Sequence, residues 1–246
     1  NYASLIPAEK IEFSSLEFEK QCLLYILYYA TEKYDEFEYL SSDLMTTNLI
    51  KSLVEYLKKE GIVYVSPDSP IKAFQEKNFP FKYYDDKVNY VINVSFTEVD
   101  KKIICNRIFT AEGIPEDDIK KVFRKIVYED LLDVFEKLLL DRNISFQPTN
   151  EQLKKFKDLL DELSYTQISY LCYKVAVHYN DNITTGRFYK SKVPQQVLAT
   201  VNTFYHNSMN KYGNVYKNNP EYAGKILRHF IQDILKKDMS ILNEVI

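Results

Sequence analysis

A short segment near the C-terminus alternates three cations with two aromatic residues: Arg187, Phe188, Tyr189, Lys190 and Lys192. Arginine and lysine can neutralise phosphates, while phenylalanine and tyrosine rings can stack on unpaired bases. Pro194 follows and should open a helix, whose first backbone N–H groups would add donors for a phosphate. These residue types at this spacing predict a contact with nucleic acid.

The same mixture recurs further along the chain, in Lys211, Tyr212, Tyr216 and Lys217. Both segments also fit a simpler interpretation, in which the aromatic rings pack beneath surface loops and the lysines only face water. The sequence leaves the two interpretations open.

The formal net charge of the 246-residue chain is -3, which by itself argues against a strongly basic nucleic-acid binder. The charge is, however, unevenly distributed along the chain. Residues 1–96 carry -5, residues 97–165 carry -3 and residues 166–246 carry +5. The basic C-terminal third suits a binding surface, although a charge dipole on a protein with no nucleic-acid partner would give the same numbers.

Residues suited to catalysis or metal binding are few and badly spaced. The histidines are His178, His206 and His229. The cysteines are Cys22, Cys105 and Cys172. Neither set has the spacing of a zinc site, and five glycines leave little material for a phosphate loop. We expect no enzyme activity and no cofactor, with a hydrolase using His178 or His229 as a minor alternative.

The apolar run from Cys22 to Ala30 is about half the roughly 20 residues that a membrane-spanning helix needs. We therefore expect no membrane partner, and a cytoplasmic protein whose three cysteines are buried thiols.

The N-terminal elements that position these residues follow a characteristic order. Apolar spacing predicts a helix over 15–34, a helical turn over 39–44 and a helix over 47–60 that a threonine caps and Gly61 ends. Strands are expected over 62–65 and 88–96, separated by a proline-bearing segment in which Lys72, Lys77 and Lys82 lie among aromatic residues.

Residues 40–65, within a region of about 12–97, resemble a winged helix-turn-helix domain. The resemblance implies that helix 47–60 is a recognition helix, whose Thr47, Asn48 and Lys51 could reach base edges in the major groove. The acidic surroundings favour the other use of such domains, as modules for self-association or partner docking. The proline-bearing segment is a second possible contact surface.

Helices dominate the rest of the chain. Periodicity predicts them over about 116–140, over the residues after the capping-box sequence at 149–152, and over 166–179, 194–207 and 220–237. A polar connector over 180–192 carries the segment described first.

The whole arrangement is similar to DnaD-like primosomal and phage replication-initiation proteins. Residues 135–204 carry this likeness, through Phe135-Glu136-Lys137, Pro148-Thr149, Lys174-Val175-Ala176-Val177 and the Phe188-Tyr189 pair. In that family the winged helix oligomerises and the C-terminal domain binds DNA and helicase components. The stretch from residues 163–167 onward is also loosely similar to uncharacterised proteins of integrative and plasmid elements.

The sequence thus predicts a mainly α-helical protein, with a winged-helix domain and small β-wing at 1–100 and a helical bundle at 101–246. We expect a DNA-associated protein of replication or mobile-element maintenance. It would contact DNA through the basic loops and self-associate or dock a partner through the winged helix. The alternative is a protein-interaction module that binds no nucleic acid.

Overall fold

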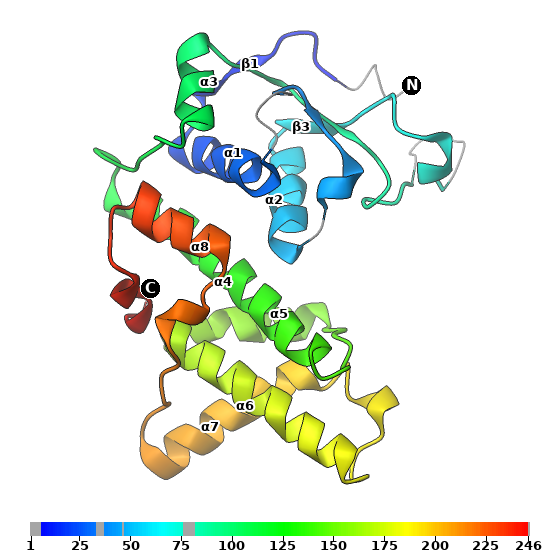
Figure 1. Ribbon diagram of the computed structural model, residues 1–246, viewed down its shortest axis with the longest axis vertical. Helices are drawn as coiled ribbons and strands as arrows, with labels where there is room; N and C mark the ends of the chain where they lie inside the picture. The colour runs from blue at the N-terminus through cyan, green and yellow to red at the C-terminus, as the bar shows by residue number, and fades with distance from the viewer. Residues whose placement is uncertain (1–5, 33–36, 46, 76–81, 246) are drawn as a thin grey trace. The chain divides into compact units, whose positions relative to one another are not determined.

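A computed structural model of the chain describes residues 6–32, 37–45, 47–75 and 82–245 (Figure 1). Within them the protein is mainly helical with small sheets, so the mainly α-helical prediction is confirmed. The chain divides into two compact units, Asn1–Val122 and Phe123–Ile246, here called unit 1 and unit 2. The division falls inside the long helix α4 (Glu116–Leu140).

Unit 1 is built from short strands and three helices before α4. The strands are β1 (Ile11–Glu12), β2 (Tyr39–Leu40), β3 (Val63–Val65), β4 (Tyr90–Ile92) and β5 (Val94–Ser95). The helices are α1 (Phe18–Thr31), α2 (Asn48–Lys59) and α3 (Glu98–Cys105), with single 3-10 turns η2 (Phe13–Ser15), η3 (Ser42–Leu44) and η4 (Ile71–Ala73).

The single strand expected over 88–96 is divided into β4 and β5, and these two short strands belong to different small sheets. β4 lies between β2 and β3, antiparallel to both, and β5 pairs in parallel with β1. The break between β4 and β5 falls at the buried Asn93, whose backbone N–H donates to the carbonyl of Ile62 at 2.8 Å and whose side chain donates to the carbonyl of Glu9 at 3.3 Å. Because one residue serves both sheets, the chain changes partner there.

Helices α1 and α2 fill the core of unit 1 in different ways. α1 is buried on nearly every side between Cys22 and Tyr29, whereas α2 buries one stripe at three- and four-residue spacing. The stripe consists of Leu49, Ile50, Leu53, Val54 and Leu57. The opposite face of α2 therefore remains available to solvent.

Both ends of α2 have the predicted chemistry. The Thr47 hydroxyl caps the helix by accepting a hydrogen bond from the backbone N–H of Ile50 at 3.2 Å. At the other end Gly61 takes a φ of 70°, and the N–H of Ile62 donates to the carbonyl of Leu57 at 2.9 Å. This bond and the positive φ form a Schellman cap.

Unit 2 continues from α4 as a set of packed helices. They are α5 (Asn150–Asp158), α6 (Tyr165–Thr184), α7 (Val197–Tyr212) and α8 (Lys225–His229). Short turns complete the unit: η5 (Leu159–Asp161), η6 (Lys190–Lys192), η7 (Pro220–Tyr222), the π-helical η8 (Phe230–Ile234) and η9 (Met239–Asn243). Capping boxes start α5 at Thr149, as predicted, and α6 at Ser164.

The expected connector over 180–192 is wrong in its first half, because α6 runs on to Thr184. Polar side chains there bond to helix carbonyls instead of breaking the helix: the Thr184 hydroxyl donates to the carbonyl of Asn180 at 2.8 Å and the Asn182 amide to that of His178 at 2.7 Å. Gly186, at a φ of 73°, then ends the turn.

Helix α7 starts later and ends later than the range 194–207. Val193 and Pro194 are buried, and the carbonyl of Pro194 accepts from the N–H of Gln147 at 3.3 Å, so this turn is held against the preceding loop. At the far end Gly213 adopts a φ of 65° and provides a left-handed cap. The helix therefore includes Lys211 and Tyr212.

The single helix expected over 220–237 is divided into η7, α8 and η8. The division follows from Asp130, a side chain of α4 that is 4% exposed. Its carboxylate accepts a hydrogen bond from the Tyr165 hydroxyl at 2.8 Å and from the N–H of Gly224, the residue that caps α8, at 3.1 Å. One buried acid thus joins α4, α6 and α8, and burial raises its pKa to about 6.

Candidate nucleic-acid interface

The loop between α6 and α7, residues 185–196, carries the segment that the sequence singled out. Arg187, Lys190 and Lys192 are exposed, and none of them has a carboxylate within ion-pair distance in the described part of the chain. η6 places Lys190 and Lys192 on a single tight turn. The loop thus presents three unneutralised positive charges.

Phe188 and Tyr189 differ although they are adjacent. The Phe188 ring packs against His178 and Tyr179, with centroids 5.8 and 5.5 Å away, and is 38% exposed. Tyr189 is 78% exposed. The interpretation that the rings pack beneath the loop therefore describes Phe188, whereas Tyr189 is available for stacking.

Lys211, Tyr212, Tyr216 and Lys217 lie around the end of α7. The rings of Tyr212 and Tyr216 are 6.3 Å apart, and Tyr216 also contacts Tyr170 of α6 at 5.8 Å. Tyr212 and Tyr216 are 57% and 64% exposed. We call Tyr170, Tyr212 and Tyr216 the tyrosine cluster.

Two lysines, Lys211 and Lys217, lie beside the tyrosine cluster in the chain. The ammonium of Lys211 lies 5.0 Å from the centre of the Tyr212 ring, and a hydrogen bond with that tyrosine raises the pKa of Lys211. Lys217 donates to the carbonyl of Asn243 at 3.0 Å. No carboxylate is involved at either lysine in the described residues, so both remain available to an anion.

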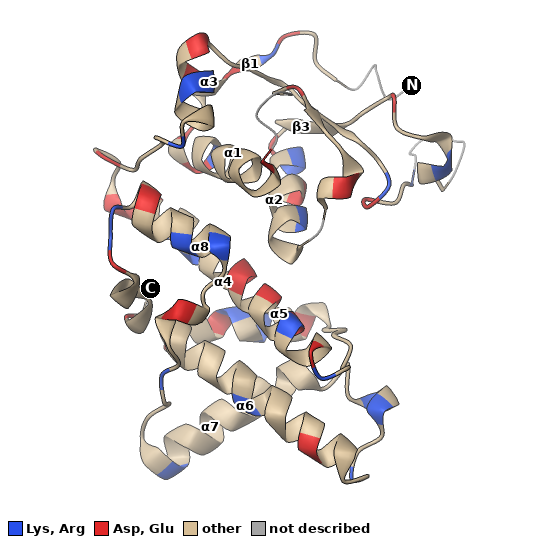
Figure 2. Cartoon of the chain, in the orientation of Figure 1, with Lys and Arg blue, Asp and Glu red and all other residues tan. Residues whose placement is uncertain are grey.

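The loop and the tyrosine cluster lie at opposite ends of an antiparallel helix pair. Near the end of α6, Tyr179 bonds to Thr200 of α7 at 2.8 Å, while near its start Gln167 donates to the carbonyl of Val215 at 3.2 Å. The positions Gln167 and Asn182 on α6 are about 22 Å apart at 1.5 Å per residue. Figure 2 shows basic residues at both ends of the pair.

A row of side chains on α6 connects the two ends, which the sequence analysis missed. Tyr170, Lys174 and His178 follow at four-residue spacing and so share one face. Tyr170 contacts Tyr216 at one end and His178 contacts Phe188 at the other. We call this row the 170–178 ridge, and four-residue spacing in a helix was the signal that could have found it.

Thr47, Asn48 and Lys51, which the sequence analysis expected on a recognition helix, have a different setting. Thr47 is engaged as the cap of α2, and Asn48 is the first residue of the helix. Lys51 is exposed and has no ion pair with any described residue. One free lysine is a small positive surface.

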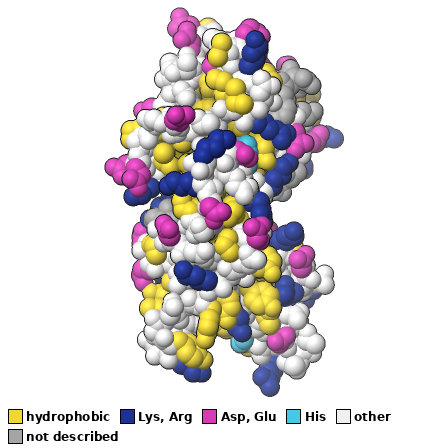
Figure 3. Space-filling model, turned by 60° about the vertical axis from the view of Figure 1, so that its left-hand side comes forward, with side chains coloured by type: hydrophobic (Ala, Val, Ile, Leu, Met, Phe, Trp, Pro, Cys, Tyr) yellow, Lys and Arg dark blue, Asp and Glu magenta, His cyan; other side chains and the backbone are white. Residues whose placement is uncertain are grey.

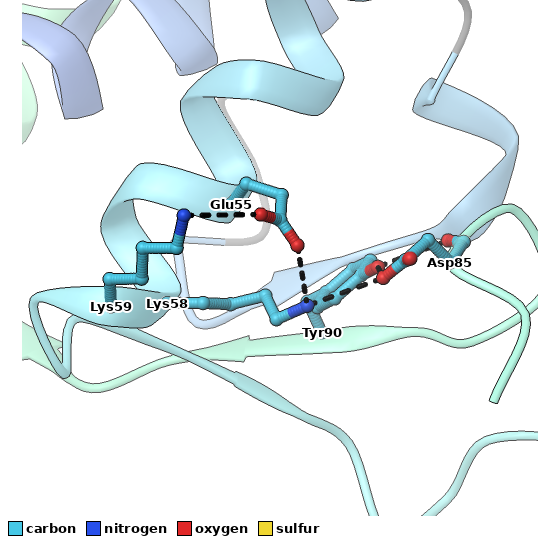
Figure 4. A network of polar contacts seen from close by, with 5 residues as sticks. All are labelled: Glu55, Lys58, Lys59, Asp85 and Tyr90. Atoms are coloured by element: carbon cyan, nitrogen blue, oxygen red, sulfur yellow. Dashed lines mark hydrogen bonds and ion pairs between the residues drawn. The ribbon is translucent and has the colours of Figure 1, made fainter. Parts of the chain in front are cut away.

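The other lysines of α2 are neutralised by a local network (Figure 4). The ammonium of Lys58 lies 3.2 Å from Asp85 and 3.7 Å from Glu55, and Lys59 lies 3.6 Å from Glu55. The Tyr90 hydroxyl donates to the same Asp85 carboxylate at 3.2 Å. Burial alone would lower the pKa of Lys58, but contacts with Tyr83 and Asp85 outweigh this and raise the pKa.

The proline-bearing segment is described in part. Lys72 and Lys82 are exposed, and an isolated bridge pairs Phe74 with Tyr83. Lys77 lies outside the described residues, as do the neighbouring aromatic residues 79 and 81. The second contact surface expected there stays a prediction.

The residues considered for catalysis are occupied by structural contacts. His229 is buried and bonds to Asp233 at 2.7 Å, while Arg228 pairs with Glu221 at 2.5 Å. His178 contacts Asn182 at 3.3 Å. Among the described residues, no group of three or more His, Cys, Asp or Glu side chains could hold a metal ion.

Cys22, Cys105 and Cys172 form no disulfide with one another, and Cys105 is exposed, so the expectation of three buried thiols is wrong for that residue. Burial raises the pKa of Cys22 and Cys172 far above the usual value, which keeps both protonated and unreactive.

No protein-family model, curated protein sequence or solved structure shows significant similarity to this chain. Within the described ranges, no helix combines the length and the apolar character required to cross a membrane.

Proposed function

We propose that the protein binds DNA through unit 2, with Arg187, Lys190, Lys192, Lys211 and Lys217 contacting phosphates. One observation carries the proposal: residues 166–220 contain six Lys or Arg and one carboxylate, Asp181. All 55 residues of this range are described, and none of the six cations forms an ion pair with a described residue. Unpaired cations of this kind supply the electrostatic part of DNA binding.

We further propose that unit 1 is a winged helix used for self-association or partner docking in replication or mobile-element maintenance. The order α1, η3, α2, β3 and β4 supports the winged-helix assignment. The neutralised lysines of α2 favour a protein contact over a DNA contact, because phosphate would have to displace carboxylates already paired. A cytoplasmic location fits this role, and three cysteines that form no disulfide with one another are consistent with it.

The DNA-binding proposal is tested by fluorescence anisotropy with labelled single- and double-stranded DNA at about 50 mM salt, where phosphate contacts are strongest. We expect binding by the full chain, and at least tenfold weaker binding when Arg187, Lys190 and Lys192 are all changed to Gln. Absence of binding to both DNA forms would overturn the proposal.

A matched control removes the same charge elsewhere. Lys102, Lys120 and Lys154 are exposed lysines of α3, α4 and α5, and changing them to Gln should leave DNA binding within about twofold, because they lie outside the proposed contacts. Equal losses in the two triple variants would mean that net charge, and not this surface, drives binding.

The second candidate is a protein-interaction module without nucleic acid. The exposed Tyr189, Tyr212 and Tyr216 favour it, since tyrosine is enriched in protein interfaces. Because the first proposal also includes self-association, the DNA-binding assay distinguishes the two: a protein that forms oligomers in light scattering but binds neither form of DNA supports this candidate.

A further inference from the structure

We infer that the α6–α7 face binds single-stranded DNA in preference to duplex, as one strand that follows the 170–178 ridge from the tyrosine cluster to the α6–α7 loop. The inference rests on the proposed phosphate contacts and adds the form of DNA and its path. It depends on exposed aromatic rings, which phosphate binding alone does not require.

An exposed aromatic ring lies beside the cations at each end of the α6–α7 pair. Tyr189 lies between Arg187 and Lys190 in the chain, and Tyr212 lies under the ammonium of Lys211. These rings, with Tyr216, are among the most exposed large apolar side chains of unit 2. In a duplex the base faces are already stacked on one another, so the rings gain contacts only from unpaired bases.

The two ends are joined by a continuous surface. Between the ring contacts at Tyr170 and His178, Lys174 is exposed and has no ion pair among the described residues. Tyr173, also exposed at 42%, lies beside Lys174 on α6. Figure 3 shows one face of the molecule, on which hydrophobic and basic side chains are interspersed. A strand can therefore meet rings and cations along its whole path.

The length of the path sets a size for the bound strand. Its ends are about 22 Å apart, the length of about six nucleotides at the 3.4 Å spacing of one strand in a duplex and fewer when the strand is extended. Affinity for oligothymidylates should rise with length until both ends are occupied, and then rise only slowly.

The test compares three probes of equal length with the full chain at about 50 mM salt: an oligothymidylate of about 12 nucleotides, an abasic strand with the same phosphates, and a duplex. We expect the oligothymidylate to bind at least tenfold more tightly than either of the others, since stacking is worth about tenfold per base. Equal affinities for the abasic and thymidine strands would overturn the inference while leaving the phosphate contacts intact. Binding of none of the probes would overturn the proposed function itself.

Substitutions locate the stacking. Changing Tyr189 and Tyr212 to Leu should weaken oligothymidylate binding at least tenfold and leave the abasic strand unaffected. The matched Phe variants keep the rings and should bind as the native protein does. Tyr189 makes no ring contact with a described residue, so its loss should not disturb folding. Leu variants that bind the oligothymidylate as tightly as the native protein would contradict the inference. They would favour the alternative, in which the exposed tyrosines contact a protein partner.

Discussion

Charged side chains do different work in α2 and in the α6–α7 pair. In α2, Lys58 and Lys59 are held by Glu55 and Asp85, and Lys58 is 18% exposed. In residues 166–220, six cations face one carboxylate and form no ion pair with a described residue. The first arrangement stabilises a helix against its sheet, whereas the second leaves its charge available to a ligand.

Asp130 is the extreme case of a charge used for structure. The folded state raises the pKa of this carboxyl to about 6, chiefly through burial, with a further rise from Asp133 and opposing effects from Tyr165, Gly224 and Arg228. The folded state therefore holds the proton more tightly than the unfolded chain. The resulting stability is full below pH 4 and is lost as pH rises through 6, by about 3 kcal/mol.

An Asp130→Asn variant measures this effect. The difference in unfolding free energy between the native protein and the variant should change by about 3 kcal/mol between pH 4 and pH 7, because Asn does not titrate. Urea unfolding followed by circular dichroism at several pH values gives this difference. A constant difference across the range would show that folding does not raise the pKa of the Asp130 carboxyl.

Gly224→Ala should destabilise unit 2 by about 2 kcal/mol. A Cβ at position 224 would lie 2.3 Å from an Asp130 oxygen, and this short buried side chain cannot move without losing its bonds to Tyr165 and Gly224. Thermal unfolding measures the loss. A Gly186→Ala variant is the control for the loop, where a Cβ would meet no atom within 4 Å and only the φ of 73° is strained.

A Lys58→Met variant tests whether the lysines of α2 stabilise the fold and take no part in DNA binding. We expect a loss of about 1 kcal/mol in stability, since Asp85 and Tyr90 lose a charged partner but Asp85 remains accessible to water. DNA affinity should not change. A variant that folds normally and binds DNA less well would place part of the DNA contact on α2.

Single charge changes at the two surfaces should have the smallest effects, of opposite kind. Asp181→Asn removes the one carboxylate of residues 166–220 and should strengthen DNA binding about threefold. Lys51→Gln, on the exposed face of α2, should change it by less than about twofold. Fluorescence anisotropy measures both, and a larger effect at Lys51 than at Asp181 would reverse the assignment of the two surfaces.

Local chemistry was the part of the fold that the sequence could predict. The caps at Thr47 and Thr149 and the glycine at 61 act within four residues of their partners, so their residue types are sufficient. The break at Gly224 depends on Asp130, 94 positions away, and no local pattern indicates it. The extension of α6 to Thr184 was missed because polar residues that usually favour turns bond to helix carbonyls there.

In the candidate site, too, the sequence could predict local features but not contacts between residues far apart in the chain. Its cations could be identified from composition, whereas the different exposure of Phe188 and Tyr189 depends on where His178 and Tyr179 lie on the folded α6. The contact of Tyr170 with Tyr216 likewise joins residues far apart in the chain. Sequence therefore located the positive charge, and the fold determined which rings accompany it.

The salt dependence of single-stranded DNA binding tests the central claim most directly. Five phosphate contacts predict a slope of about -3.5 for log affinity against log salt, and the Gln variant at Arg187, Lys190 and Lys192 should reduce it by about 2. The Gln variant at Lys102, Lys120 and Lys154 should keep the native slope. A native slope near zero, or the same reduction in both variants, would contradict the assignment of phosphate binding to the α6–α7 face.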